Sequence, residues 1–168
     1  MNWVERSGRF LALAFLALLW PVIDSYQRGL IRGQAVPVFA GATVAYCVAY
    51  GWYSMWGFKL RGLAAPAATV IALTILGVVL ERVRAQPDAN FFLISLMVAG
   101  FGLTPVIALI AIGLVGAISV GDTILLAGSM TPELAVQLAL YIPVILLFGG
   151  FTLLTVAADI VNPISILK

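Results

Sequence analysis

Long apolar stretches, each bounded by charged or turn-forming residues, set the pattern of this chain. A helix needs about 20 mostly apolar residues to cross a hydrocarbon core of about 30 Å. A helix that faces lipid is apolar on every side, so helical periodicity adds little here. The pattern predicts an all-α transmembrane helix bundle of five to six membrane segments in a single domain, residues 1–168. The expected segments are 8–23, 36–58, 63–80, 90–102, 105–120 and 133–158.

The uncharged stretch over residues 90–120 is too long for one ordinary span. As a straight helix it would extend about 46 Å, at about 1.5 Å per residue. Gly100, Gly102 and Pro105 interrupt its middle, and such residues favour a turn or a break. We therefore expect two short segments on either side of the break, forming a helical hairpin or one broken helix.

Two further signals shape the C-terminal part of the chain. Residues 122–130 follow Gly121 and are expected to form a loop. Thr131 is expected to cap the last helix, because Pro132 suits the first helical position. Pro143 lies inside that helix and predicts a kink.

The second expected segment is crowded with amphipathic aromatic residues. Such residues are enriched where a helix meets the membrane–water interface. We therefore interpret them as an interfacial belt, formed by Tyr46, Tyr50, Trp52, Tyr53 and Trp56.

Composition supports a membrane protein and excludes several other classes. Hydrophobic residues make up 63% of the chain and charged residues 10%, with a mean hydropathy of +1.14. An ordinary soluble domain carries about 25% charged residues. The net charge of +2 is too small to indicate a nucleic-acid partner. Cys47 is the single cysteine, which excludes a disulfide framework.

The first apolar stretch imitates a cleaved signal peptide, because Arg6 and Arg9 precede it. It is followed by Trp20, Pro21 and Asp24, where a cleavage site would require small residues. We therefore expect a retained first helix.

The sequence contains no residue pattern that indicates catalysis. The chain contains no histidine, which removes imidazole metal ligands and histidine bases. No glycine-rich phosphate loop ending in Lys-Ser or Lys-Thr is present. We therefore expect no enzyme activity, no catalytic residue, no cofactor and no metal.

Charged residues are expected only at segment ends and in loops, whereas transporters often keep ionisable groups within the membrane. Asp24 and Asp159 lie deepest in the pattern. Asp24 is interpreted as an interfacial residue at a helix end, with a polar sensor of bilayer thickness as the alternative. The candidate sensor or hinge positions are Pro21, Asp24, Gly100, Gly102, Pro105 and Pro143.

The order of these features is similar to that of a known family. Residues 18–24 end the first segment, an aromatic segment follows, and a charged elbow at residues 81–84 leads into residues 91–102. This order resembles the membrane sensor half of DesK-like sensor histidine kinases of actinobacteria, over about residues 10–154. The resemblance implies a multi-pass protein of the bacterial plasma membrane that senses bilayer state or envelope stress.

The family passes its signal through the last helix into a kinase, and this sequence departs at that point. Pro163 would interrupt a continuous signalling helix, and no histidine box follows it. Kinase activity is therefore not carried over to this chain, which is expected to be a truncated gene, a fragment or a stand-alone relative.

The sequence thus predicts a non-catalytic membrane sensor, and two alternatives stay open. These are a membrane subunit that binds a partner protein and a small transporter or channel subunit. The expected partners are the lipid bilayer and either a second copy or another membrane protein, without nucleic acid. Positive charges do not decide the orientation. With six segments, Arg28, Arg32, Arg82 and Arg84 fall on one side, and Arg6, Arg9, Lys59, Arg61 and Lys168 on the other.

Overall fold

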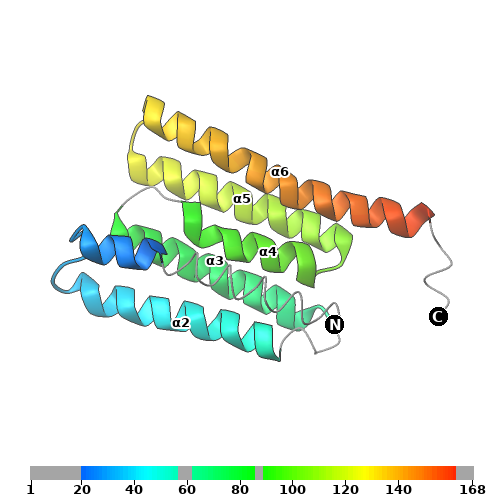
Figure 1. The fold of residues 1–168 in the computed structure, drawn as a ribbon, viewed down its shortest axis with the longest axis horizontal. Coiled ribbons are helices and arrows are strands. Elements are labelled where there is room, and N and C mark those ends of the chain that lie inside the picture. Colours follow the sequence, from blue (N-terminus) through cyan, green and yellow to red (C-terminus); the bar gives the residue numbers. More distant parts are fainter. Residues whose placement is uncertain (1–19, 57–61, 86–88, 162–168) are drawn as a thin grey trace.

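The computed structural model describes residues 20–56, 62–85 and 89–161 (Figure 1). Throughout these ranges the chain forms helices and short connections, which confirms the all-α helical bundle. Most of the first expected segment lies outside the described residues, which begin with a helix over residues 20–27.

The remaining elements follow in chain order. They are α2 (Ala35–Met55), α3 (Ala64–Arg84), the 3-10 helix η2 (Ala89–Phe92), α4 (Leu93–Gly102), α5 (Pro105–Ala127) and α6 (Pro132–Val161). Three of them, α2, α3 and α5, are long and apolar enough to cross a membrane. With 21, 21 and 23 residues they extend about 32–35 Å, which matches a hydrocarbon core of about 30 Å.

Consecutive helices from α2 to α6 alternate in direction, so α3 and α5 run the same way (Figure 1). The ten-residue α4 lies among α3, α5 and α6 and contacts all three. Six of its residues are buried, so this short helix forms the centre of the bundle. At about 15 Å, α4 alone covers only half of a bilayer core.

The aromatic residues of α2 do not form a single interfacial belt, so that prediction was wrong. Trp52 and Trp56 are exposed, whereas the three tyrosines are buried against the rest of the bundle. Tyr46 is fully buried, and its hydroxyl donates a hydrogen bond of 2.6 Å to the carbonyl of Phe91. A buried tyrosine hydroxyl needs such a partner, and this one joins α2 to η2.

The predicted break between α4 and α5 is confirmed, and it takes the hairpin form. α4 ends at Gly102, and α5 begins at Pro105 after two extended residues. Gly102 fits here because it has no side chain. A Cβ atom at this position would lie 2.9 Å from Cβ of Pro66 and closer still to the hydroxyl of Tyr53.

The expected loop over residues 122–130 was wrong, because α5 continues to Ala127. Leu125, Leu126 and Ala127 are good helix formers, and Asp122 is accommodated within the helix by an ion pair. The helix ends where Gly128 adopts a φ of 68°, and its N–H donates to the carbonyl of Ile124 at 3.1 Å.

α3 is also longer than the expected segment, since it continues through the charged residues 81–84. Arg82 and Arg84 occupy its last turn, where positive charge interacts favourably with the helix dipole. The helix ends at Ala85, whose N–H donates to the carbonyl of Glu81 at 2.9 Å. Ala85 has a φ of 53°, so it adopts the left-handed conformation, in which its β-carbon crowds the following carbonyl oxygen.

Replacing Ala85 by glycine is therefore expected to stabilise the protein by about 0.5–1 kcal/mol, because glycine adopts this conformation without a steric penalty. Unfolding in mixed micelles of a mild detergent and dodecyl sulfate would measure the change. The matched control is Ala117→Gly at an exposed position inside α5, which should destabilise by about 1 kcal/mol. Equal destabilisation by both variants would contradict the prediction.

The predicted start of α6 is confirmed. Pro132 is its first residue, and the hydroxyl of Thr131 accepts a hydrogen bond of 3.2 Å from the N–H of Leu134. Pro143 lies inside the helix, as expected. The side chain of Asp159 and the whole of Pro163 lie outside what the structure describes.

Candidate functional site

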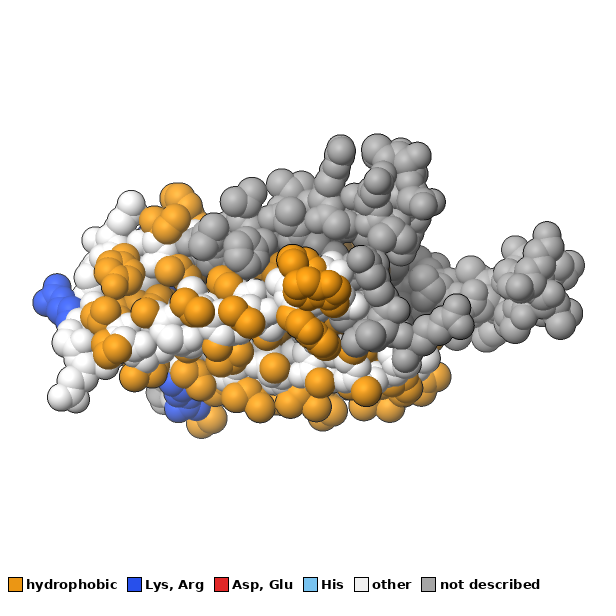
Figure 2. All heavy atoms as spheres, turned by 90° about the horizontal axis from the view of Figure 1, so that it is seen from below, with side chains coloured by type: hydrophobic (Ala, Val, Ile, Leu, Met, Phe, Trp, Pro, Cys, Tyr) orange, Lys and Arg blue, Asp and Glu red, His pale blue; other side chains and the backbone are white. Residues whose placement is uncertain are grey.

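Charged side chains gather at one end of the bundle. This end combines the C-termini of α3 and α5, the N-terminus of α6 and the turn that precedes α2 (Figure 1). Every charged side chain that the structure describes belongs to it: Asp24, Arg28, Arg32, Glu81, Arg82, Arg84, Asp122 and Glu133. The four arginines expected on one side of the membrane thus share an end. Figure 2 shows basic side chains at one end of the face it presents, beside a largely hydrophobic surface.

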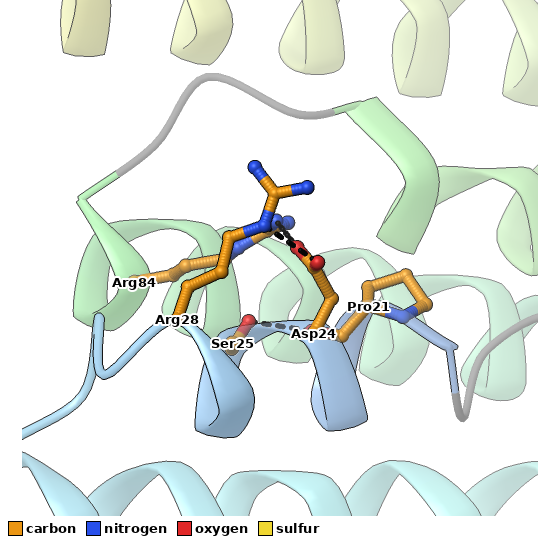
Figure 3. Close-up of polar contacts among 5 residues, drawn as sticks. All are labelled: Pro21, Asp24, Ser25, Arg28 and Arg84. Carbon is orange, nitrogen blue, oxygen red and sulfur yellow. Dashed lines mark hydrogen bonds and ion pairs between the residues drawn. The ribbon is translucent and has the colours of Figure 1, made fainter.

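Asp24 is the centre of the first part of this cluster (Figure 3). One carboxylate oxygen lies 2.7 Å from Nε of Arg28, one helical turn later. The other lies 3.3 Å from Nη2 of Arg84 on α3. The Arg84 side chain is 5% exposed and the Arg28 side chain 66%, so the aspartate joins a buried arginine to an exposed one.

The local backbone helps to place Asp24. The hydroxyl of the next residue, Ser25, is fully buried and donates a 2.5 Å hydrogen bond to the carbonyl of Pro21 (Figure 3). This bond satisfies a polar group that could not reach water, and it returns to the helix's own backbone four residues earlier. The helix over residues 20–27 therefore presents its aspartate to α3.

The second part of the cluster joins α3 to α5. Nε of Arg82 donates to Oδ1 of Asp122 at 2.7 Å, and a second nitrogen of the guanidinium also contacts that oxygen. The Asp122 side chain is 6% exposed, whereas that of Arg82 is 48% exposed. A carboxylate buried to this extent requires a positive partner, which Arg82 supplies from the neighbouring helix.

Further polar groups are buried beside these ion pairs. Glu81 on α3 and the two hydroxyl residues Ser119 and Thr123 on α5 are almost completely buried. Tyr141 on α6 lies next to Ser119 and within electrostatic range of Glu81. The cluster thus links α3, α5 and α6 through buried polar side chains. No group of three or more metal-ligating side chains occurs within the described ranges.

The predicted candidate positions do not form one site. Pro21 and Asp24 lie in the charged cluster, while Gly102 and Pro105 lie at the break near the opposite end of the bundle. Gly100 lies two residues before Gly102 on α4, and Pro143 lies inside α6.

Sequence reasoning missed the buried charges of the cluster. Glu81 and Arg84 lie at the end of α3 as expected, but both are buried, and Asp122 is buried within α5 where a loop was expected. One local signal was available, because the residues after Asp122 resume an apolar run that a helix can continue. The partner arginine lies 40 residues earlier, which no local pattern shows.

No family model, curated protein or solved structure matches the chain. The evidence for its class is therefore in the molecule itself. Large apolar side chains are mostly exposed on the surface. The exposed fractions of Leu125, Leu140 and Leu147, for example, are 71%, 69% and 70%. Exposed apolar surface on this scale, together with three spanning-length apolar helices, is typical of a membrane protein.

Proposed function

We propose that this chain is a non-catalytic signal-input domain that crosses a bacterial plasma membrane several times and responds to the state of the bilayer. The observation that carries the proposal is that two ion pairs join three helices at the same end of the bundle. Asp24–Arg84 and Arg82–Asp122 connect the helix over residues 20–27, α3 and α5 there.

These ion pairs give a physical route from the thickness of the bilayer to the packing of the helices. Helices respond to a thinner or thicker hydrocarbon core by tilting, at a modest cost in free energy per Å of mismatch. Helices joined by ion pairs at one end tilt by separating or approaching at the other. A change of bilayer therefore shifts the population between two helix packings, which is the form of response that a signal-input domain requires.

The short α4 supports the same proposal. It covers about half the thickness of the bilayer core, while α3 and α5 on either side cover all of it. The α4–α5 connection at Gly102 and Pro105 lies at the end without described charges, where tilting moves helices most. The resemblance of the sequence to DesK-like sensor halves points to the same class of function.

Distances between spin labels in bilayers of increasing acyl-chain length would test this proposal. In a Cys47→Ala background, Met55→Cys with Thr104→Cys reports on the end without described charges, and Gln27→Cys with Ser129→Cys reports on the charged end. All four positions are exposed. The first distance is expected to change by about 1–2 Å or more across the series, and the second to stay constant. Identical distances for both pairs in every bilayer would overturn the proposal.

A small transporter or channel subunit is the second candidate, and one observation favours it. Glu81, Ser119, Thr123 and Tyr141 form a buried polar region between α3, α5 and α6, which ion-transporting proteins often contain. Ion or solute flux in proteoliposomes, abolished by Glu81→Gln, would favour this function over sensing.

A further inference from the structure

Four buried side-chain oxygens of α5 and α6 make no hydrogen bond within the part of the chain that the structure describes. They are Oγ of Ser119, Oδ2 of Asp122, Oγ1 of Thr123 and the hydroxyl oxygen of Tyr141. These residues are 0%, 6%, 2% and 8% exposed, so the oxygens lie inside the bundle. Buried polar atoms in proteins are nearly always satisfied by protein groups, ordered water or an ion. This group of oxygens therefore indicates a bound ligand.

Other threonine hydroxyls of the bundle are satisfied by their own helices. Thr43, Thr69 and Thr74 each donate a hydrogen bond of 2.7–2.8 Å to the carbonyl four residues earlier. Such bonds are a common way to satisfy a hydroxyl inside a helix. Ser119 and Thr123 also have a helical carbonyl four residues earlier, yet neither hydroxyl bonds to it. Their oxygens therefore stay available to a ligand.

The packing of α5 against α6 brings these oxygens to one level of the bundle. Residues 119–123 span about 6 Å, or about one turn of α5. Gly116 packs against α6, because a Cβ atom there would lie 3.1 Å from Cδ1 of Ile145. The two helices run in opposite directions (Figure 1), so Ser119 lies level with Tyr141. The hydroxyls of these two residues are accordingly neighbours.

Two carboxylates lie beside the hydroxyls. Both guanidinium nitrogens of Arg82 that contact Asp122 meet Oδ1, which leaves Oδ2 on the buried side. Glu81 is 0% exposed and lies within electrostatic range of Tyr141. A carboxylate can only accept hydrogen bonds, and a hydroxyl can also offer a lone pair to a cation. The atoms gathered here are therefore suited to a positive ligand, whereas an anion would be repelled by both carboxylates.

The number of carboxylates indicates the charge of that ligand. Hard cations take oxygen ligands, and protein sites for Ca²⁺ usually supply several carboxylates. Here hydroxyls outnumber carboxylates, and Asp122 already shares its charge with Arg82. Such a site suits a single positive charge better than a divalent ion.

We propose that residues 119–123 of α5, together with Tyr141 of α6, bind one monovalent cation such as Na⁺. Asp122 and the hydroxyls of Ser119, Thr123 and Tyr141 supply the oxygens, and Glu81 adds negative charge from α3. Ionisable groups inside membrane helices are commonly associated with ions.

This inference goes beyond the sensing role and does not depend on it. Binding at equilibrium satisfies the inference, so neither a response to bilayer thickness nor transport across the membrane is required. The experiment below uses protein in detergent and measures no distance. Failure of one proposal is therefore distinguishable from failure of the other.

Binding of radioactive sodium to the purified full chain in detergent would test the site. Protein immobilised on scintillation beads reports bound ion without a separation step. We expect saturable binding that unlabelled NaCl displaces and choline chloride at the same ionic strength does not, because choline is too large for a site among packed side chains. Absence of saturable binding, or equal displacement by the two salts, would overturn the proposal.

Two substitutions with matched controls assign the binding to residues. Thr123→Val keeps the shape of the side chain but removes the hydroxyl, so the affinity for Na⁺ should fall about tenfold. Thr123→Ser keeps the hydroxyl and should retain binding. Thr74→Val removes a buried hydroxyl that bonds to its own helix, and it should bind Na⁺ like the unchanged protein.

Tyr141→Phe provides a second, independent variant should Thr123→Val fail to fold. It should weaken Na⁺ binding to a similar extent, whereas Tyr53→Phe, at a buried tyrosine of α2, should not. Unchanged affinity in both Thr123→Val and Tyr141→Phe would overturn the assignment to α5 and α6. Equal losses in the variants and their controls would show a general effect of removing buried hydroxyls and would also overturn it.

Discussion

Replacing Gly102 by alanine is expected to destabilise the protein by about 2–3 kcal/mol, because the added methyl group has no space. A Cβ atom there would lie 2.9 Å from Cβ of Pro66 and even closer to the hydroxyl of Tyr53. Both neighbours belong to other helices, so relief requires α4 to move away from α2 or α3. Unfolding of the purified protein in mixed micelles would measure the loss of stability.

A second substitution separates crowding from a general effect of glycine replacement. Tyr53→Phe removes the oxygen nearest to the new methyl group, so the double variant should recover part of the lost stability. Full recovery is not expected, because Pro66 remains close. Gly113→Ala is the matched control: no atom lies within 4 Å of a Cβ atom there, and alanine favours a helix. Equal destabilisation at both glycines would contradict the argument.

Replacing Asp24 by asparagine is expected to destabilise the protein by about 2–4 kcal/mol. The substitution leaves the side chain of Arg84, which is 5% exposed, without the charge of this carboxylate. Removing one member of a buried pair is far more harmful than losing an exposed one, since the remaining charge cannot reach water. The same unfolding measurement in mixed micelles applies. Limited proteolysis should also show faster cleavage near residues 20–27 in the variant.

Arg28→Gln provides the control for this prediction because it removes the exposed partner of the same aspartate. The Arg28 side chain is 66% exposed, so its ion pair should contribute about 0–1 kcal/mol. Comparable losses from both variants would mean that the stability of the charged end does not depend on the buried pair. The sensing response is also to be compared in Asp24→Asn, which removes the ion pair between the helix over residues 20–27 and α3 but keeps the Arg82–Asp122 pair.

The features that sequence predicted well are those that depend on neighbouring residues. Gly102 and Pro105 mark the break because each restricts the backbone within its own turn. Thr131 and Pro132 mark the start of α6 for the same reason. The membrane character of the helices also follows from local composition.

The features that sequence missed depend on partners far along the chain. Asp122 was assigned to a loop because it follows Gly121, and the partner that accommodates it in a helix, Arg82, lies 40 residues away. Tyr46 was assigned to an interface because amphipathic aromatic residues crowd its segment, and the acceptor of its buried hydroxyl, the Phe91 carbonyl, lies 45 residues away. The residues around each of these positions are apolar, so the local composition did not indicate either pairing.

The long separation within the ion pairs also constrains how the protein enters its membrane. Synthesis proceeds from the N-terminus, so α3 emerges before the residue that neutralises its half-exposed arginine. We therefore expect the Arg82 side chain to stay at the level of the headgroups, extended toward water, until α5 is synthesised. Asp122, its partner on α5, lies 40 residues further along the chain. Asp122 can then be carried below the surface of the bundle only by docking against α3. We therefore expect the pairing of α3 with α5 to accompany the insertion of α5.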